Sequence, residues 1–340
     1  MLSRRHVLAG AAAVAAAPLL LPGRAVAAEG TDWGEWLAKH RDNVKVFADD
    51  GRDGRIAHQE CRMSPMASAY KAIHAAAFAG SGINPQRQIK IRDWESYYLP
   101  GTDGNAHPNS LAMLGIPANG AWAADPDQLV PLDWVVRAMI IQSDNSAADY
   151  LHDLLGVPAL RRTAARGGWP EAQVPALIGQ VLRLWWPGTN DELARRFLTD
   201  TEFHAAALAK LSQPPIVDPF AWAKTTHRAS AVDLASLHRS IATERIPGRR
   251  YLELALAPLV QPGELGIGYK GGELPGILTL AFSLRRADGT IGISVVLVSD
   301  LTADDYKALH ANEGDFAMFC LGMLRDPAVL ARVGKALGHA

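Results

Sequence analysis

Cysteine is scarce in this chain, with Cys61 and Cys320 the only two among 340 residues. Neither lies in a C-x-x-C pattern or beside clustered histidines, so the sequence indicates no zinc site, and we expect no metal and no cofactor. An oxidising compartment would permit a disulfide, but two cysteines this far apart in sequence do not predict one. We interpret both as buried free thiols, which pack like small apolar side chains.

An excess of charge of either sign is also absent. Lys and Arg number 34 against 35 Asp and Glu, which gives a formal net charge of -1. This balance gives no indication of a nucleic-acid partner, and the absence of an acidic run gives none of a disordered tail. With 49% hydrophobic residues, the composition is that of a globular protein with one large domain or two coupled ones.

The N-terminal apolar run is too short to span a membrane. Two arginines at residues 4–5 precede an Ala-rich run of about 15 residues, interrupted by Pro18, whereas a spanning helix needs about 20. Small residues at 25–27 offer a cleavage site. We therefore predict a twin-arginine export signal over residues 1–28, cleaved near Ala28, rather than an N-terminal anchor. No Cys follows the run, so we expect a periplasmic or secreted protein without a lipid anchor.

Periodicity and turn signals predict strands towards both ends of residues 29–340 and helices between them. Strands are expected at residues 44–47, 55–61, 266–269, 277–286 and 291–299. Helices are expected at residues 31–41, 68–78, 131–142, 146–156, 190–198, 201–211, 231–242 and within 304–336, with residues 83–130 rich in loops. The predicted class is α/β of the α+β kind. One antiparallel sheet (about 29–64 and 230–340), covered by the terminal helices, would lie beside an all-helical lobe (about 65–229).

The segment Ser68-Ala69-Tyr70-Lys71 places a hydroxyl and an amine three residues apart at the start of a predicted helix. Residues at this spacing share a helix face, so the Lys71 amine can reach the Ser68 hydroxyl. The helix N-terminus favours negative charge that develops near Ser68, and a buried lysine among other cations can act as a base. A surface serine and lysine would match the same pattern often, so the motif alone is weak.

Two further segments carry polar groups of catalytic type. Ser143-Asp144-Asn145 falls in a break between two predicted helices, where a hydroxyl could relay a proton and a carboxamide could hold a substrate amide. The alternative is a helix N-cap, a role that Asp and Asn both favour. Lys270-Gly271-Gly272 lies on a predicted strand, where a cation could hold a substrate carboxylate and lower the pKa of Lys71. The alternative there is an edge lysine beside a glycine bulge.

Together these segments resemble the ordered elements S-x-x-K, S-D-N and K-T-G of class A β-lactamases and penicillin-binding proteins. The sequence around residues 65–68, 141–148 and 230–235 is similar to that family as well. The resemblance covers nearly all of residues 40–335 except 160–225. It implies a β-lactamase-like fold, with the antiparallel sheet flanked by terminal helices and the helical lobe beside it.

The resemblance also implies the reaction. Ser68 would attack a carbonyl group and form an acyl-enzyme, and Lys71 would accept the Ser68 proton. Ser143, assisted by Lys270, would pass a proton to the leaving nitrogen or oxygen.

Substrate-binding groups follow from the same resemblance. Asn145 would hold the substrate amide. The backbone N–H groups of Ser68 and Glu273 would form the oxyanion hole, with Gly272 next to Glu273 on the substrate-binding strand.

Two departures from the family pattern limit the functional prediction. No W-E-P-E-L-N-like segment supplies the deacylating glutamate, and Glu171, after Trp-Pro, is the nearest candidate for the base that activates water. Gly271 replaces the threonine of K-T-G, and Glu273 shares its strand face. There Glu273 could repel an anionic substrate; alternatively it turns outward and pairs with an arginine such as Arg285.

We therefore predict an exported serine hydrolase that forms an acyl-enzyme, with β-lactam hydrolysis as the nearest family activity. An esterase or peptidase acting on another acyl compound is the second prediction, and a non-catalytic β-lactamase-like binding protein is the third. The intact set of Ser68, Lys71, Ser143 and Lys270 argues against a pure binder. The expected partner is a small-molecule β-lactam, ester or peptide, and the protein is expected to be a monomer.

Overall fold

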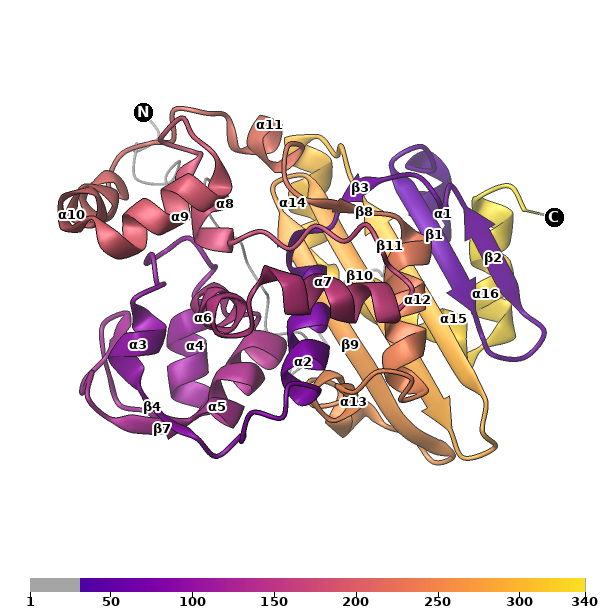
Figure 1. The fold of residues 1–340 in the computed structure, drawn as a ribbon. Coiled ribbons are helices and arrows are strands. Elements are labelled where there is room, and N and C mark those ends of the chain that lie inside the picture. The colour runs from indigo at the N-terminus through magenta and orange to yellow at the C-terminus, as the bar shows by residue number, and fades with distance from the viewer. Residues whose placement is uncertain (1–30, 340) are drawn as a thin grey trace.

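The computed structural model describes residues 31–339, so the predicted export signal lies outside the described residues. Its central element is a five-stranded antiparallel sheet with the strand order β2-β1-β11-β10-β9 (Figure 1). The strands are β1 (Val44–Asp49), β2 (Arg55–His58), β9 (Glu264–Leu274), β10 (Ile277–Arg286) and β11 (Ile291–Val298). Val44 pairs with Val298, so the two ends of the chain share one sheet, as the sequence predicts.

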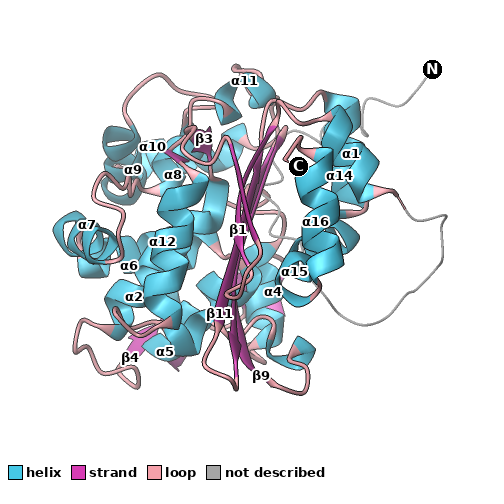
Figure 2. Cartoon of the chain, turned by 90° about the vertical axis from the view of Figure 1, so that its right-hand side faces the viewer, coloured by secondary structure: helices cyan, strands magenta, loops and turns pink. Residues whose placement is uncertain are grey.

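Helices cover both faces of this sheet, which Figure 2 shows nearly edge-on. One face is covered by α1 (Trp33–Lys39), α14 (Ala303–Ala311), α15 (Glu313–Arg325) and α16 (Pro327–Ala336). The other face packs against α2 (Lys71–Ala79) and α12 (Ala231–Ala242). Because both faces are covered, β11 is apolar at nearly every position and does not alternate. Val296 joins the core under the terminal helices, and Val295 joins the core under α2.

The helical lobe lies to one side of the sheet and is built from the middle of the chain (Figure 1). Its helices are α3 (Ile91–Glu95), α4 (Ala106–Met113), α5 (Leu132–Arg137), α6 (Asn145–Leu155), α7 (Val157–Arg166), α8 (Leu177–Leu182), α9 (Asn190–Thr199), α10 (Thr201–Lys210) and α11 (Pro219–Ala223). Short paired strands lie in the same segment: β4 (Gln88–Lys90) with β7 (Leu129–Pro131), and β5 (Ala118–Asn119) with β6 (Trp122–Ala123). The sequence analysis predicts an all-helical lobe, and these strand pairs correct that prediction. Two further elements join the lobe to the sheet: the pair β3 (Ser64–Pro65) with β8 (Arg228–Ala229), and α13 (Arg249–Leu252).

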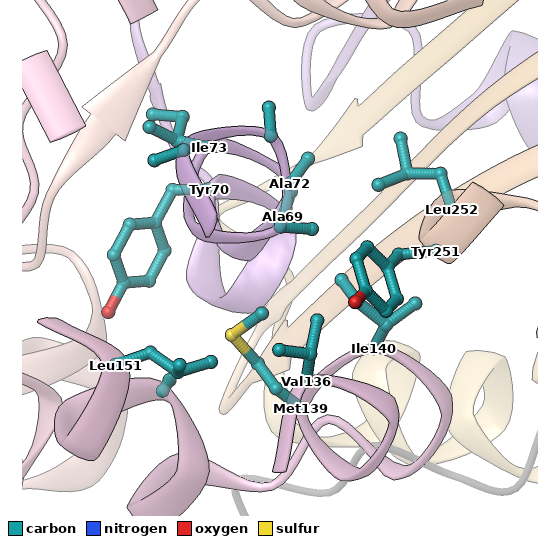
Figure 3. Close-up of a cluster of buried hydrophobic side chains, with 14 of the residues drawn as sticks. Ala69, Tyr70, Ala72, Ile73, Val136, Met139, Ile140, Leu151, Tyr251 and Leu252 are labelled. Carbon is teal, nitrogen blue, oxygen red and sulfur yellow. The ribbon is translucent and has the colours of Figure 1, made fainter. Parts of the chain in front are cut away.

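Helix α2 is buried between the lobe and the sheet. Every residue of Lys71–Phe78 is buried, and the alanines among them let neighbouring elements approach closely. Figure 3 shows residues of this segment against side chains from α5, the turn that follows it, α6 and α13. The labelled residues are Ala69, Tyr70, Ala72, Ile73, Val136, Met139, Ile140, Leu151, Tyr251 and Leu252. This packing fixes the position of the segment that carries Ser68 and Lys71.

Several sequence predictions need correction. Residues 83–130 include α4, whose buried side includes the polar His107 and Ser110 and therefore shows little apolar periodicity. The helix expected over 131–142 changes to a π-helical turn at Ala138–Gln142. Cys320 is a buried free thiol, as expected, but Cys61 is an exposed free thiol that lies beyond the end of β2 at His58. Among residues 31–339, no helix combines the length and the apolar character needed to cross a membrane.

Candidate active site

Ser68 lies on a 3₁₀ turn, Ala67–Tyr70, that leads directly into α2. The residue before it, Ala67, has φ 48°, a left-handed conformation that is rare for a residue with a Cβ. Ser68 is 4% exposed and lines a small cavity together with Asn145 and His227. The strained residue next to the hydroxyl is typical of functional sites, where surrounding packing holds unfavourable backbone conformations.

Lys71 begins α2 and is fully buried. Its Nζ donates to Ser143 O at 2.5 Å, to Ser143 Oγ at 3.2 Å and to Asn145 Oδ1 at 2.6 Å. Ser68 Oγ is not among these partners, although the two side chains stand three residues apart. Burial lowers the pKa of Lys71 to about 7, because the charged ammonium loses its hydration there. A neutral amine is therefore available near neutral pH.

Ser143 and Asn145 follow the π-helical turn at Ala138–Gln142. Ser143 has φ 59° and ψ 31°, so a second left-handed, non-glycine residue carries a candidate catalytic group. Its Oγ lies between two lysines, at 3.2 Å from Lys71 Nζ and 2.9 Å from Lys270 Nζ. Asn145 Nδ2 is buried and has no hydrogen-bond partner among residues 31–339, which leaves this donor available to a substrate carbonyl.

Strand β9 brings Lys270 and Gly272 to the same site at the edge of the sheet. Lys270 is buried, and burial, followed by the charge of Lys71, holds its pKa well below the usual range of lysine. Gly272 approaches the nucleophile turn so closely that a Cβ on it would lie 2.4 Å from Ser68 N. A glycine is therefore required at this point for β9 to pass beside Ser68.

The sequence analysis singles out the same residues. The sequence matches the profile described as the Beta-lactamase enzyme family over residues 33–261, more than half of the chain. The chain belongs to the β-lactamase enzyme family. A comparison with curated proteins found no significant match.

Solved β-lactamase structures share the fold. A β-lactamase from Sphaerobacter thermophilus DSM 20745 aligns with a TM-score of 0.54 and 16% identity, covering 91% of this chain and 99% of that one. The TLA-1 extended-spectrum β-lactamase gives a TM-score of 0.51 and 16% identity, with 91% and 99% covered. A β-lactamase from Chitinophaga pinensis DSM 2588 gives 0.50 and 14%, with 79% and 89% covered. At this identity the likeness shows the β-lactamase-like fold alone.

Glu273 lies where neither sequence interpretation puts it. Arg285 pairs with Glu253, at 2.6 Å, so the expected outward pairing with Glu273 is wrong. Glu273 is 3% exposed and accepts from Tyr306 on α14 at 2.8 Å, on the face that the terminal helices cover. Its carboxylate does not line the cavity at Ser68, so it is not placed to repel a substrate there.

Gly271 shares that face of β9, and a Cβ on it would lie 2.1 Å from Tyr269 Oη. The space that the threonine side chain of the K-T-G pattern would need is therefore taken by a tyrosine. Gly271 therefore leaves room for the Tyr269 side chain on the same strand.

Glu171, the predicted deacylation base, is exposed on a turn before α8 and does not line the Ser68 cavity. Besides Ser68 and Asn145, the polar side chains that line this cavity are Gln180 and His227. His227 Nε2 is 2.7 Å from Ala67 O, and its Nδ1 is 2.8 Å from Gln180 Nε2. Burial lowers the pKa of His227 to about 4, so the ring is neutral, with Nε2 donating to Ala67 and Nδ1 accepting from Gln180. Both ring nitrogens are occupied, which leaves no lone pair to activate water.

Asp144 belongs to a buried network that the sequence analysis misses. It caps α6 through Ala147 N at 2.9 Å, as the N-cap alternative predicts. Its other oxygen contacts His107 Nδ1 at 2.9 Å, and His107 Nε2 lies 3.2 Å from Glu95 Oε1. The two carboxylates outweigh burial and raise the pKa of His107 to about 9. These residues are far apart in sequence and carry no motif, so only the fold reveals that they hold the Ser143 segment in place.

Proposed function

We propose that this protein is an exported hydrolase that uses Ser68 to form an acyl-enzyme with a β-lactam or a related acyl compound. The observation that supports this most directly is the position of Ser143 Oγ. It lies within hydrogen-bond distance of two buried lysines, Lys71 at the start of α2 and Lys270, and Asn145 of the same segment lines the cavity at Ser68. A buried lysine is costly unless it loses its charge or its N–H groups find acceptors. Lys71 donates to Ser143 O and to Asn145 Oδ1.

The proposed reaction is the following sequence of proton transfers. Ser68 Oγ attacks the carbonyl carbon, and its proton passes to the neutral amine of Lys71. The C–N or C–O bond to the leaving group then breaks, and the leaving atom takes a proton from Ser143 Oγ, which is resupplied from Lys71. Lys270 stabilises the charge on Ser143 during this transfer. The backbone N–H groups of Ser68 and Glu273 are proposed as the oxyanion hole, and Asn145 Nδ2 as the amide-binding donor.

Deacylation is proposed to be slow. Water attack on the ester requires a base near the carbonyl group, and among residues 31–339 the cavity at Ser68 offers, besides Asn145, only Gln180 and a neutral, fully bonded His227 as polar side chains. Glu171 would have to move from its exposed turn to serve. The arrangement favours a protein that is acylated by β-lactams and releases the product slowly, as penicillin-binding proteins are expected to do.

Intact-protein mass spectrometry tests the proposal. The mature protein is incubated with a panel of β-lactams and simple esters, and the adduct mass is followed over time. We expect an adduct on Ser68 that persists with at least one β-lactam. Rapid adduct loss with turnover would favour an efficient β-lactamase, ester-only labelling would favour an esterase, and no labelling would favour a binding protein. N-terminal sequencing of exported material tests the signal, and we expect it to begin near Ala28.

A further inference from the structure

On the side of the sheet that α14 and α15 cover, three side chains from different elements converge. Glu273 comes from β9, His310 from the last turn of α14 and Glu313 from the first turn of α15. One ligand-type atom of each lies within 4.8 Å of the other two. His310 Nδ1 is 2.6 Å from Glu273 Oε1, and Tyr306 donates to the same oxygen. We call these three residues the Glu273–His310–Glu313 cluster.

The cluster contains buried carboxyl oxygens that its neighbours leave without hydrogen bonds. Glu273 and Glu313 are 3% and 6% exposed. Their Oε2 atoms are both buried and have no hydrogen-bond donor among residues 31–339. The ion pair that the cluster does contain is internal, between His310 and Glu273. Buried carboxyl oxygens without partners are costly, and a cation bound within the cluster would satisfy both.

We propose that Glu273, His310 and Glu313 form a binding site for one divalent transition-metal ion, with Zn²⁺ as the representative. Two carboxylate oxygens and one imidazole nitrogen are a ligand set that Zn²⁺ accepts, with water in a fourth position. The imidazole disfavours Ca²⁺ and Mg²⁺, which take oxygen ligands. The His310 side chain is 44% exposed, which gives an ion a path to the buried carboxylates.

The geometry requires only a small adjustment. Ligand atoms about 2.1 Å from a tetrahedral Zn²⁺ stand roughly 3.4 Å apart, so the widest separation in the cluster, at most 4.8 Å, must shorten by about 1.4 Å or less. The 2.6 Å contact between His310 Nδ1 and Glu273 Oε1 must open by about 0.8 Å for both atoms to bind the ion. His310 and Glu313 flank the junction between α14 and α15, at Asn312, where side chains and backbone can shift without disturbing a helix interior. The sequence gives no sign of this site, because Glu273 is far from the other two ligands and a helix break separates His310 from Glu313.

Binding of Zn²⁺ to the mature protein tests the proposal. The protein carries Cys61→Ser, because that thiol is exposed and would bind zinc on its own. After treatment with EDTA and dialysis, Zn²⁺ is titrated and followed by calorimetry and by native mass spectrometry. We expect one Zn²⁺ per chain and a higher Tm on binding. Ca²⁺ in place of Zn²⁺ should bind at least about tenfold more weakly.

Single substitutions locate the ion. Glu313→Gln and His310→Gln should each weaken Zn²⁺ binding about tenfold or more, and Tm measured in EDTA shows whether each variant is folded. The matched control is His204→Gln, a partly buried histidine on α10 that should leave binding unchanged. The proposal is overturned if Zn²⁺ does not bind, if both cluster variants bind it as the parent does, or if Ca²⁺ binds equally well. Labelling of Ser68 by a β-lactam is a separate readout, so these outcomes do not depend on the proposed reaction.

Discussion

The two faces of strand β9 bury ionisable groups of opposite kinds, a lysine on one face and a glutamate on the other. On the face towards the helical lobe, Lys270 is 3% exposed and donates to Ser143 Oγ and to a backbone carbonyl. Three residues later, on the face towards the terminal helices, Glu273 is also 3% exposed, and one of its oxygens has no partner within residues 31–339. A single strand thus separates a site built on lysines, the lysine face, from a site built on glutamates, the glutamate face.

The comparison shows how each site relieves the cost of its charge. On the lysine face burial lowers the pKa of Lys71 to about 7, so a proton is lost and a base is created. On the glutamate face burial, and then the charge of Glu273, raise the pKa of Glu313 to about 8. On the lysine face both lysines are hydrogen-bonded, which suits precise proton transfer. On the glutamate face two carboxyl oxygens have no partner among residues 31–339, so this face has groups free to bind a further ligand.

The largest expected effect is the loss of the nucleophile on the lysine face. Ser68→Ala should abolish the covalent adduct with β-lactams and lower any turnover by about 10⁴-fold or more, because a methyl group cannot attack a carbonyl. Adduct formation is measured by intact-protein mass spectrometry. The matched control is Ser64→Ala, a buried serine on β3 whose Oγ has no partner among residues 31–339, and it should retain labelling. An adduct on the Ser68→Ala variant would show that another residue is the nucleophile.

Loss of the base should have the next largest effect. Lys71→Ala should slow acylation about 10²–10⁴-fold, the usual cost of removing a general base, with little change in ground-state binding. Stopped-flow acylation with a chromogenic β-lactam separates the rate from the binding constant. Lys45→Ala is the control, since Lys45 is a buried lysine on β1 that bonds Ser299 and lies outside the site. Wild-type acylation by the Lys71→Ala variant would exclude the proposed role.

The pH profile of acylation should report the same group. Because Lys71 acts as a base only when neutral and its pKa is lowered to about 7, the acylation rate should rise with pH through about 7 and level off above it. The Lys71→Ala variant should lose this step. A wild-type rate that does not change between about pH 5.5 and 8.5 would contradict a titrating lysine base.

The adjacent glycines of β9 test the two faces directly. Gly272→Ala places a Cβ 2.4 Å from Ser68 N and should lower acylation about 10²-fold, the scale of a lost oxyanion donor. Gly271→Ala places a Cβ 2.1 Å from Tyr269 Oη on the other face and should cost stability, about 1–3 kcal/mol, with little effect on acylation. Urea unfolding and stopped-flow acylation are measured on both. Equal losses of acylation would mean that the faces are not independent.

How much of this could be predicted from the sequence depends on how local the signal is. The motif residues Ser68, Lys71, Ser143, Asn145 and Lys270 come together as the resemblance implies. Each motif is short and lies in one local element: a helix start, a break between helices or a strand. The strand period correctly puts Gly271 and Glu273 on one face, but it does not say which layer that face meets. Side-chain partners from distant elements, such as Tyr306, decide this, and they have no motif.

The same limit explains the site residues that the sequence analysis misses. His107 and His227 are single histidines with no spacing pattern, and their roles follow from carboxylates or carbonyls brought to them by packing. Glu171 shows the converse error: a local likeness to a family segment suggests a role, but its exposed turn lies outside the Ser68 cavity. Local patterns predict elements and motif chemistry, whereas contacts between distant elements depend on the whole fold.

The smallest effect on the reaction should come from the glutamate face. Tyr306→Phe removes the hydroxyl that donates to Glu273 at 2.8 Å and leaves the ring in place. A lost hydrogen bond to a buried carboxylate should lower the free energy of unfolding by about 1–2 kcal/mol, as measured by urea unfolding in EDTA. Acylation of Ser68 should stay close to the wild-type rate, because the Glu273 side chain does not line the cavity and only its backbone is proposed to bind the oxyanion. A fall in acylation comparable to that of Gly272→Ala would show instead that the Glu273 carboxylate holds the backbone N–H of Glu273 in position. The glutamate face would then support the reaction on the lysine face.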